Sequence, residues 1–335
     1  MHVTLVVTVL DEEKSLRRLL DTLAGQTRRP DNVVIADGGS TDNTPTMLDE
    51  YVRTGRLPLQ VISAPGSNIS QGRNAAIRTA AGPIIAVTDA GVRLSPDWLE
   101  KLVAPIEAGR STAAGFFQAD PYTLFETVMG ATVLPAVQDI NPNTFLPSSR
   151  SVAFLKASWE AVGGYPEWLD YCEDLIFDLW LQDKHGPFPF VPDAVVHFRP
   201  RGGLRSFFIQ YYRYARGDGK ADLWRKRHVI RYATYLLAVP LIAGLGMKRS
   251  PWFWGLFLLG GAIYARRPVQ RLRPVMRTLL LKDKLTVLGT IPLIRLVGDT
   301  AKMIGYPVGV WWRLTSGRAE DWKLQITHPK RVPNA

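Results

Sequence analysis

Short apolar runs and amphipathic stretches alternate through the N-terminal part of the chain. The apolar runs are rich in β-branched residues and short, which favours buried strands over helices. They cover residues 3–9, 33–36, 59–62 and 84–87. Between the first two runs, a helical spacing is set by Leu16, Leu19, Leu20 and Leu23. This alternation predicts an α/β fold built on a parallel sheet.

Lone carboxylates follow two of these predicted strands. Asp37 ends the second run and Asp89 ends the fourth, each close to glycine. Ligands of open parallel sheets bind beyond the carboxyl ends of the strands, so both residues are candidate site residues. The chain has neither the Gly-x-Gly-x-x-Gly dinucleotide motif after its first strand nor a P-loop. A phosphate-bearing ligand would therefore need a metal ion or arginines.

Two acidic pairs stand where helices are predicted to begin. They are Asp11-Glu12 and Glu173-Asp174. Acidic side chains suit the first turn of a helix, because the helix dipole is positive there. One interpretation is therefore structural for both pairs. For Glu173-Asp174 the other interpretation is catalytic, since a transfer reaction can need a carboxylate as general base.

Several motifs, in order along the chain, resemble those of family 2 glycosyltransferases with the GT-A fold. The first-strand turn of that family is matched by Val9-Leu10-Asp11-Glu12, its Asp-Gly-Ser-x-Asp signature by residues 37–42, and its Arg-Asn helix by Gly72-Arg73-Asn74. Thr88-Asp89-Ala90-Gly91 occupies the place of the Asp-x-Asp motif. Gly91 departs from the family pattern, because it replaces the second aspartate, which is usually the firmer metal ligand.

The resemblance implies an inverting enzyme that uses a nucleotide-diphospho-sugar donor. The implied donor-nucleotide site comprises Val9, Asp11, Glu12, Asp37, Gly38, Arg73 and Asp89. The pair at residues 173–174, downstream of Gly163-Gly164-Tyr165, resembles the family's Glu-Asp motif. That implies Asp174 as the general base, supported by Glu173.

The resemblance also implies a divalent cation at the diphosphate. Asp89 and His197 would share Mn²⁺ or Mg²⁺. A histidine ligand favours Mn²⁺ over Mg²⁺. The alternative for His197 is a purely structural role, which is the more common role of a lone histidine.

The net charge of +11 is concentrated in two basic segments, residues 199–231 and 266–284. In the first, the Gln-Tyr-Tyr-Arg-Tyr run resembles the Gln-x-x-Arg-Trp motif of polysaccharide synthases. It implies a diphosphate or acceptor site made of Arg199, Arg201, Gln210, Arg213 and Tyr214. The alternative is a juxtamembrane segment that binds lipid headgroups. No named nucleic-acid motif is present, so nucleic acid is not an expected partner.

Residues 232–247 and 250–265 are uncharged. Each is shorter than the roughly 20 residues that cross a bilayer, so they predict either a hairpin of short spans or a re-entrant or interfacial pair. Soluble core helices are the alternative. The basic flanks favour a cytoplasmic position for both outer ends. Residues 285–312 predict an amphipathic interfacial helix, with Arg295, Asp299 and Lys302 on one face.

The predicted organisation is a GT-A domain at residues 1–200, a basic juxtamembrane segment at 201–231, two short hydrophobic helices at 232–265, and a basic linker, interfacial helix and polar tail at 266–335. The GT-A domain implies a mainly parallel sheet flanked by helices, and the C-terminal part a helical membrane-associated module. The single cysteine, Cys172, excludes an internal disulfide and fits a reducing compartment.

We therefore expect a glycosyltransferase at the cytoplasmic face of the cell membrane, acting on a lipid-linked or polysaccharide acceptor. The loss of a carboxylate at Gly91 motivates an alternative, a catalytically weakened membrane partner or scaffold. A nucleotidyltransferase would share the α/β sheet but would give no reason for the Glu173-Asp174 pair.

Overall fold

The computed structural model describes residues 1–316 of the 335-residue chain, in two compact units. Within this range, the N-terminal unit comprises residues 1–118 and 137–199, and the helical unit comprises residues 119–136 and 200–316. The second unit thus begins near the predicted domain boundary, but it also takes in a segment from the middle of the predicted GT-A domain. The end of the predicted polar tail, residues 317–335, lies outside the described residues.

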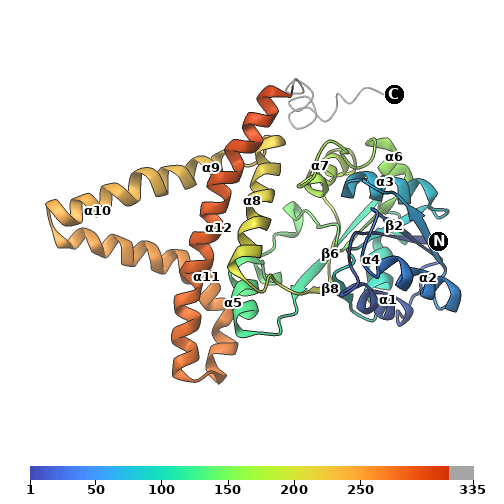
Figure 1. Ribbon diagram of the computed structural model, residues 1–335, viewed down its shortest axis with the longest axis horizontal. Coiled ribbons are helices and arrows are strands. Elements are labelled where there is room, and N and C mark those ends of the chain that lie inside the picture. The colour runs from blue at the N-terminus through green and yellow to red at the C-terminus, as the bar shows by residue number, and fades with distance from the viewer. Residues whose placement is uncertain (317–335) are drawn as a thin grey trace. The chain divides into compact units, whose positions relative to one another are not determined.

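The N-terminal unit is built on one mixed sheet with helices packed around it (Figure 1). The strand order in this sheet is β3-β2-β1-β4-β7-β6-β8-β5. Its strands are β1 Val3–Val9, β2 Asn32–Asp37, β3 Leu59–Ser63, β4 Ile84–Val87, β5 Val92–Leu94, β6 Thr112–Ala119, β7 Val152–Leu155 and β8 Phe190–Phe198. The prediction of parallel pairing is confirmed for β1 to β4. Beyond β4 the sheet is antiparallel, at β4–β7, β6–β7 and β5–β8, so "mainly parallel" describes only its first half.

Local composition explains why part of the antiparallel half escaped prediction. β5 has only three residues, and β6 is rich in alanine and glycine, which are poor strand formers. Gly115 in β6 has a packing reason. A Cβ there would lie 2.6 Å from the carbonyl oxygen of Ala194 in β8, so only glycine allows this approach.

The sheet register brings the predicted strand tips to one edge. Val9 of β1 is opposite Asp37 of β2, and Val6 of β1 is opposite Val87 of β4. Asp89, two residues beyond β4, therefore lies at the same edge of the sheet as Asp37. This is the edge at which parallel strands present ligand sites.

The helices of the N-terminal unit are α1 Leu16–Ala24, α2 Thr44–Thr54, α3 Ile69–Thr79, α4 Trp98–Glu107, α6 Lys156–Ala161 and α7 Glu173–His185. Two short 3₁₀ turns, Val137–Asp139 and Pro142–Thr144, precede β7. The predicted leucine stripe of α1 is fully buried against the sheet. Trp98 at the start of α4 is also buried, and its indole Nε1 donates to Ser151 Oγ at 2.8 Å.

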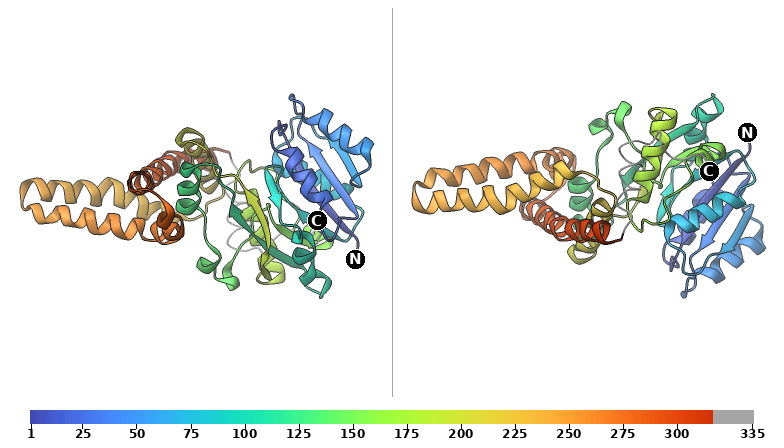
Figure 2. Two further views of the ribbon diagram at one scale, coloured as in Figure 1. Left: turned by 90° about the horizontal axis from the view of Figure 1, so that it is seen from below. Right: turned by 90° about the horizontal axis from the view of Figure 1, so that it is seen from above.

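The helical unit contains α5 Leu124–Val133, α8 Leu204–Lys220, α9 Arg225–Tyr232, a π-helical stretch Ala233–Ala238, α10 Val239–Lys248, a 3₁₀ turn Pro251–Phe253, α11 Trp254–Thr278 and α12 Leu281–Thr315. The stretch from α9 through α10 is one helix, Arg225–Lys248, and it is long and apolar enough to cross a membrane. With α11 it forms an antiparallel hairpin (Figure 2). The first predicted apolar segment, residues 232–247, lies inside this longer helix, whereas the second, residues 250–265, begins in the 3₁₀ turn region and continues into α11.

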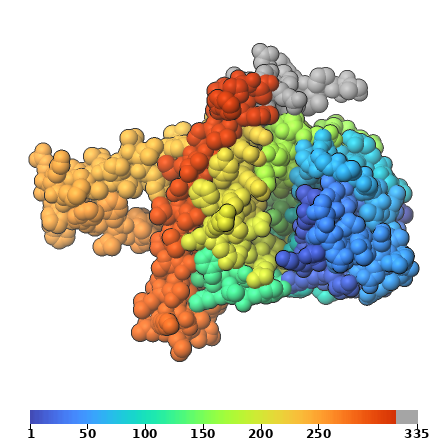
Figure 3. Space-filling view, in the orientation of Figure 1, coloured from blue at the N-terminus to red at the C-terminus, as the bar shows by residue number. Residues whose placement is uncertain are grey.

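Helices α8 and α12 lie side by side (Figure 3), and glycines line their contact. A Cβ at Gly305 of α12 would collide with the carbonyl oxygen of Tyr212, and one at Gly309 with that of Arg216. Such small residues let two helix backbones approach closely.

Side chains of the same unit cover the polar face of α12. Asp299 accepts hydrogen bonds from Arg231 Nε at 2.7 Å, from the Tyr235 hydroxyl at 3.0 Å, and from the Tyr264 hydroxyl. Lys302 lies over the ring of Tyr211. These contacts give the charged residues partners within the protein. The interfacial position of this helix stays a prediction.

Candidate active site

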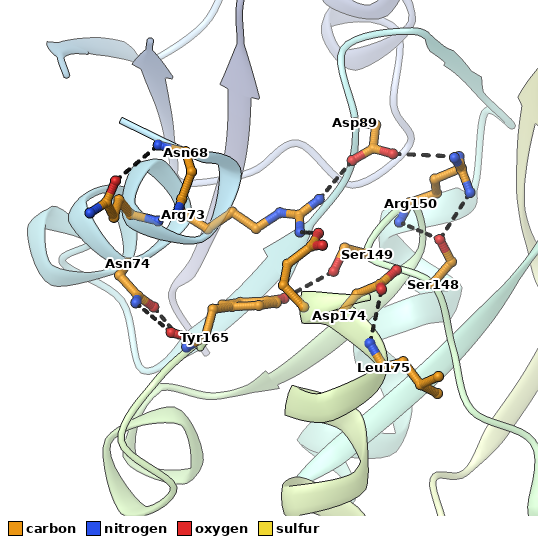
Figure 4. Close-up of polar contacts among 12 residues, drawn as sticks. Asn68, Arg73, Asn74, Asp89, Ser148, Ser149, Arg150, Tyr165, Asp174 and Leu175 are labelled. Carbon is orange, nitrogen blue, oxygen red and sulfur yellow. Dashed lines mark hydrogen bonds and ion pairs between the residues drawn. The ribbon is translucent and has the colours of Figure 1, made fainter. Parts of the chain in front are cut away.

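The site centres on Arg73, which α3 carries beneath the edge of the sheet (Figure 4). A capping box of Asn68 and Gln71 fixes the start of α3. The Arg73 side chain is only 2% exposed, and it lies between two carboxylates. Its Nη1 donates to Glu173 Oε1 at 2.7 Å, and its Nη2 donates to Asp89 Oδ1 at 3.0 Å. One guanidinium therefore ties the tip of β4 to the start of α7.

Arg150, a residue without a predicted role, contacts the other side of Asp89. Its Nε lies 3.4 Å from Asp89 Oδ2, and its Nη1 donates to Ser148 Oγ at 3.1 Å. Its guanidinium lies over the ring of Phe198, 4.8 Å from the centroid. The hydroxyl of Thr88 donates to the Arg150 carbonyl at 2.8 Å, which fixes the arginine's backbone beside the strand tip.

The two predicted catalytic acids occupy the first turn of α7. Asp174 Oδ1 accepts from the backbone N–H of Leu175 at 2.8 Å. Glu173 is almost fully buried. Its burial and the Asp174 carboxylate raise the pKa of Glu173 to about 7, while the Arg73 guanidinium acts in the opposite direction. The charge of Glu173, the neighbour of Asp174, therefore depends on pH. Asp174 is the more exposed of the two acids.

Asp178 adds a third carboxyl group one turn further along α7, where no site residue was predicted. Its side chain is 1% exposed, and its Oδ2 has no hydrogen-bond partner among the described residues. Burial, followed by the Asp174 carboxylate, raises the pKa of Asp178 well above its usual range. Burial thus disfavours the charged form of Asp178, which lessens its repulsion of the Asp174 carboxylate.

The Gly163-Gly164-Tyr165 segment is anchored to α3 by Asn74. The Asn74 side chain donates to the Tyr165 carbonyl at 2.9 Å and accepts from the Tyr165 N–H at 2.9 Å. Gly164 has φ +83°, and a Cβ there would lie 2.8 Å from Asn74 Oδ1, so glycine is required. The Tyr165 ring stacks on Phe177 of α7, which fixes the start of α7 against α3.

The predicted nucleotide-binding residues at the first two strand tips hold one another in place. Asp11 has φ 54° and accepts from the Thr41 N–H at 2.8 Å, and Asp37 accepts from the Ser40 N–H at 2.9 Å. The Gly38 N–H donates to the Val9 carbonyl at 2.9 Å. The Glu12 N–H donates to Thr44 Oγ1 at 2.8 Å.

Helix α1 starts only at Leu16, so neither Asp11 nor Glu12 is in its first helical turn. No acid thus lies in the first turn of α1, although the Glu12 carbonyl accepts hydrogen bonds from the N–H groups of Ser15 and Leu16 at the start of this helix. Both residues belong to a turn that closes against the loop after β2. Their contact with a nucleotide stays a prediction, as does that of Arg73, which the structure places in a buried ion-pair network.

The residues present do not fit a divalent cation well. Both oxygens of Asp89 face guanidinium groups, and Gly91 offers no carboxylate. His197 lies in β8 opposite Arg93, and its Nε2 is 3.2 Å from Ser95 Oγ. Within residues 1–316, no group of three or more His, Cys, Asp or Glu side chains gathers as a metal site would require. The predicted pairing of Asp89 with His197 as metal ligands stays a prediction.

The predicted diphosphate or acceptor residues are divided between the two units. Arg199 follows β8 at the end of the N-terminal unit, and the others belong to the helical unit. There, Arg201 Nε donates to Gln210 Oε1 at 3.3 Å, and Gln210 Nε2 donates to the Tyr214 hydroxyl at 2.9 Å. Gln210, Arg213 and Tyr214 all lie on α8. Their role toward a ligand stays a prediction.

Parts of the chain are similar to known glycosyltransferases. Residues 4–146 match the family described as glycosyl transferase family 2. Over 103 residues the chain is 31% identical to a validoxylamine A glucosyltransferase of Streptomyces hygroscopicus subsp. limoneus, covering 30% of this chain and 23% of that protein. Over 101 residues it is 30% identical to the putative glycosyltransferase EpsH of Bacillus subtilis, covering 30% of this chain and 29% of that protein. The matches thus span less than a third of either relative.

Solved structures share the fold at low sequence identity. A mannosyltransferase of Pyrobaculum calidifontis in complex with GDP-Man and Mn²⁺ aligns with a TM-score of 0.54 and 18% identity, over 94% of this chain and 87% of that one. S. aureus TarS 1-349 in complex with UDP-GlcNAc aligns with a TM-score of 0.50 and 16% identity, over 94% of this chain and 92% of that one. These likenesses concern the fold alone.

Proposed function

We propose, from the premise that residues 4–146 belong to a family 2 glycosyltransferase domain of the GT-A fold, that the protein is an inverting glycosyltransferase. It would transfer a sugar from a nucleotide-diphospho-sugar to a hydroxyl group of an acceptor. The observation that carries the proposal is the network Asp89–Arg73–Glu173, which joins the strand tip to the helix start that bears Asp174. UDP-GlcNAc and GDP-Man, bound by the two structural neighbours, support a nucleotide-sugar donor.

The chemistry assigned to Asp174 is proton removal from the acceptor hydroxyl. As the acceptor oxygen forms its bond to the anomeric carbon, the proton passes to the Asp174 carboxylate. The bond from the anomeric carbon to the phosphate oxygen breaks at the same time, and its electron pair leaves with the nucleoside diphosphate. The Leu175 N–H donates to one oxygen of Asp174, and this hydrogen bond within α7 orients the carboxylate.

A location at the membrane is part of the proposal. Large apolar side chains on the hairpin formed by residues 225–248 and α11 are solvent-exposed: Leu237 is 69% exposed, Leu258 78% and Trp252 89%. Such a contiguous apolar surface is typical of a membrane or protein contact. We expect the hairpin to enter the bilayer from the cytoplasmic side, which would give the enzyme a lipid-linked or polysaccharide acceptor.

The test is to incubate membranes that contain the protein with UDP-, GDP- and dTDP-sugars and to measure the released products. Release of a nucleoside diphosphate from one donor is the expected result. Release of pyrophosphate would instead indicate a nucleotidyltransferase. The absence of product from every donor would support the alternative role as a membrane partner or scaffold.

A further inference from the structure

Asp89 lies between two fixed guanidinium groups at the place where the chain lacks a second carboxylate. Arg73 contacts one of its oxygens and Arg150 the other. Position 91, two residues on, is glycine, and a Cβ there would meet nothing within 4 Å. Lack of space for a Cβ is therefore not the reason why position 91 has no carboxylate.

The formal charges at this strand tip differ from those of a cation site. When ionised, Asp89 and Glu173 carry two negative charges, and Arg73 and Arg150 carry two positive charges. Two guanidinium groups thus face the single carboxylate of the strand tip, Asp89, while Glu173 and the neighbouring Asp174 lie at the start of α7. A second aspartate would leave an excess of negative charge, which is the situation that a divalent cation relieves at a diphosphate.

Arg150 is also held in one orientation. Its backbone is fixed by Thr88, its Nη1 by Ser148, and the face of its guanidinium by the ring of Phe198. Its side chain is 24% exposed, against 2% for Arg73, so Arg150 is the arginine of this pair that solvent and ligands can reach. A guanidinium presents a planar fork of N–H donors that suits phosphate oxygens, and it acts without reorganising.

We propose that Arg150 takes the place of the divalent cation at the diphosphate of the donor, so that nucleotide binding is independent of metal. This inference rests on the proposed function and names the group that stabilises its leaving phosphate. Arg73 is a positioning residue, because it holds Asp89 and Glu173 from within the protein. Arg150 contacts the phosphate oxygens and stabilises the negative charge that develops as the glycosidic bond breaks.

The experiment is a calorimetric titration of UDP, GDP and dTDP into the full-length protein in detergent, with EDTA or with Mn²⁺. We expect one nucleotide to bind with the same Kd in both conditions. Arg150→Ala should weaken that binding by roughly tenfold or more, the usual effect of losing a hydrogen bond to a charged group. Arg150→Lys should recover only part of it, because lysine lacks the planar fork.

Gly91→Asp is the matched gain-of-function variant. It should make nucleotide binding stronger with Mn²⁺ than with EDTA, and it should lower the electron paramagnetic resonance signal of free Mn²⁺ when nucleotide is added. Arg17→Ala, an exposed arginine on α1, is the control and should bind as the wild type does. Thermal unfolding of each variant shows that a loss of binding is not a loss of folding.

Two results separate the failure of this inference from failure of the proposed function. Wild-type binding that requires Mn²⁺, with Arg150→Ala unchanged, would overturn the role of Arg150 and leave the glycosyltransferase proposal standing. Failure of all three nucleotides to bind in either condition would overturn both.

Discussion

The two units of this protein hold their elements together through different contacts. In the N-terminal unit, charged side chains lie inside, and Arg73 is held between Asp89 and Glu173. In the helical unit, glycines lie inside the α8–α12 contact, while large leucines of the hairpin are exposed. The first arrangement fixes a few side chains for chemistry. The second arrangement fixes the backbones of α8 and α12 against one another, while the hairpin keeps large apolar side chains exposed.

The largest effect on stability should come from breaking the buried ion pair of the first unit. Arg73→Met leaves Glu173 buried without its partner, and we expect a loss of about 3–5 kcal/mol in the free energy of unfolding. Chemical denaturation of the full-length protein measures it. Adding Glu173→Gln should restore part of the loss, because the uncompensated charge is then removed. A loss below about 1 kcal/mol, as for an exposed pair, would contradict the role given to Arg73.

The corresponding change in the helical unit adds a single methyl group. Gly305→Ala places a Cβ against the Tyr212 carbonyl, and we expect a destabilisation of about 1–3 kcal/mol because the helices must separate. Gly289→Ala is a control on the same helix, where a Cβ meets nothing within 4 Å. It should be neutral or stabilising by up to about 1 kcal/mol, since alanine favours the helix. Equal effects of the two variants would show that α8 and α12 are not in close contact.

The pH dependence of stability reports on the buried acid Glu173 of the N-terminal unit. The folded-state pKa of Glu173, about 7, lies above the unfolded value of 4.5, so the folded protein retains this proton over a pH range in which the unfolded chain loses it. Stability should therefore fall as the pH rises from 4.5 to about 7 and should then level off. Thermal unfolding across this range measures the slope. Glu173→Gln should reduce it, and an unchanged slope would assign the proton to another group.

The smallest effect on folding should come from the exposed hairpin. Leu258→Ser should change the free energy of unfolding in detergent by less than about 0.5 kcal/mol, because this side chain is exposed. It should nevertheless weaken binding to lipid vesicles roughly tenfold, the value of one leucine moved out of an apolar phase. Vesicle flotation measures the second quantity. Undiminished binding would mean that this part of the hairpin does not enter the bilayer.

The sequence was most informative where the pattern was local. The strand runs and the leucine stripe of α1 predicted the parallel half of the sheet, and the motifs located Asp89 and Asp174. Arg150 could not be found in this way, because its backbone reaches the strand tip through a contact with Thr88, 62 residues away in the chain. That contact depends on the antiparallel pairing of β4 and β7, which the apolar pattern did not predict.

Burial also changes the interpretation of residues that the sequence motifs single out. Arg73 was expected at the nucleotide, whereas the structure gives it an internal role. The sequence does not single out Asp178 as a site residue, because no local pattern marks the burial of an acid in the middle of a predicted helix. Exposed and buried charges look alike in a sequence. In this protein the packing of α3 against α7, made through the contacts of Asn74 and Tyr165, decides which charged side chains are buried.

The most direct test of the central claim compares nucleoside diphosphate release by the wild type and by Asp174→Asn at saturating donor and acceptor-bearing membranes. Loss of the general base should lower the turnover roughly 10²–10⁴-fold, with thermal unfolding little changed because Asp174 is partly exposed. Turnover within a few fold of the wild type would contradict the assignment of Asp174 as the base.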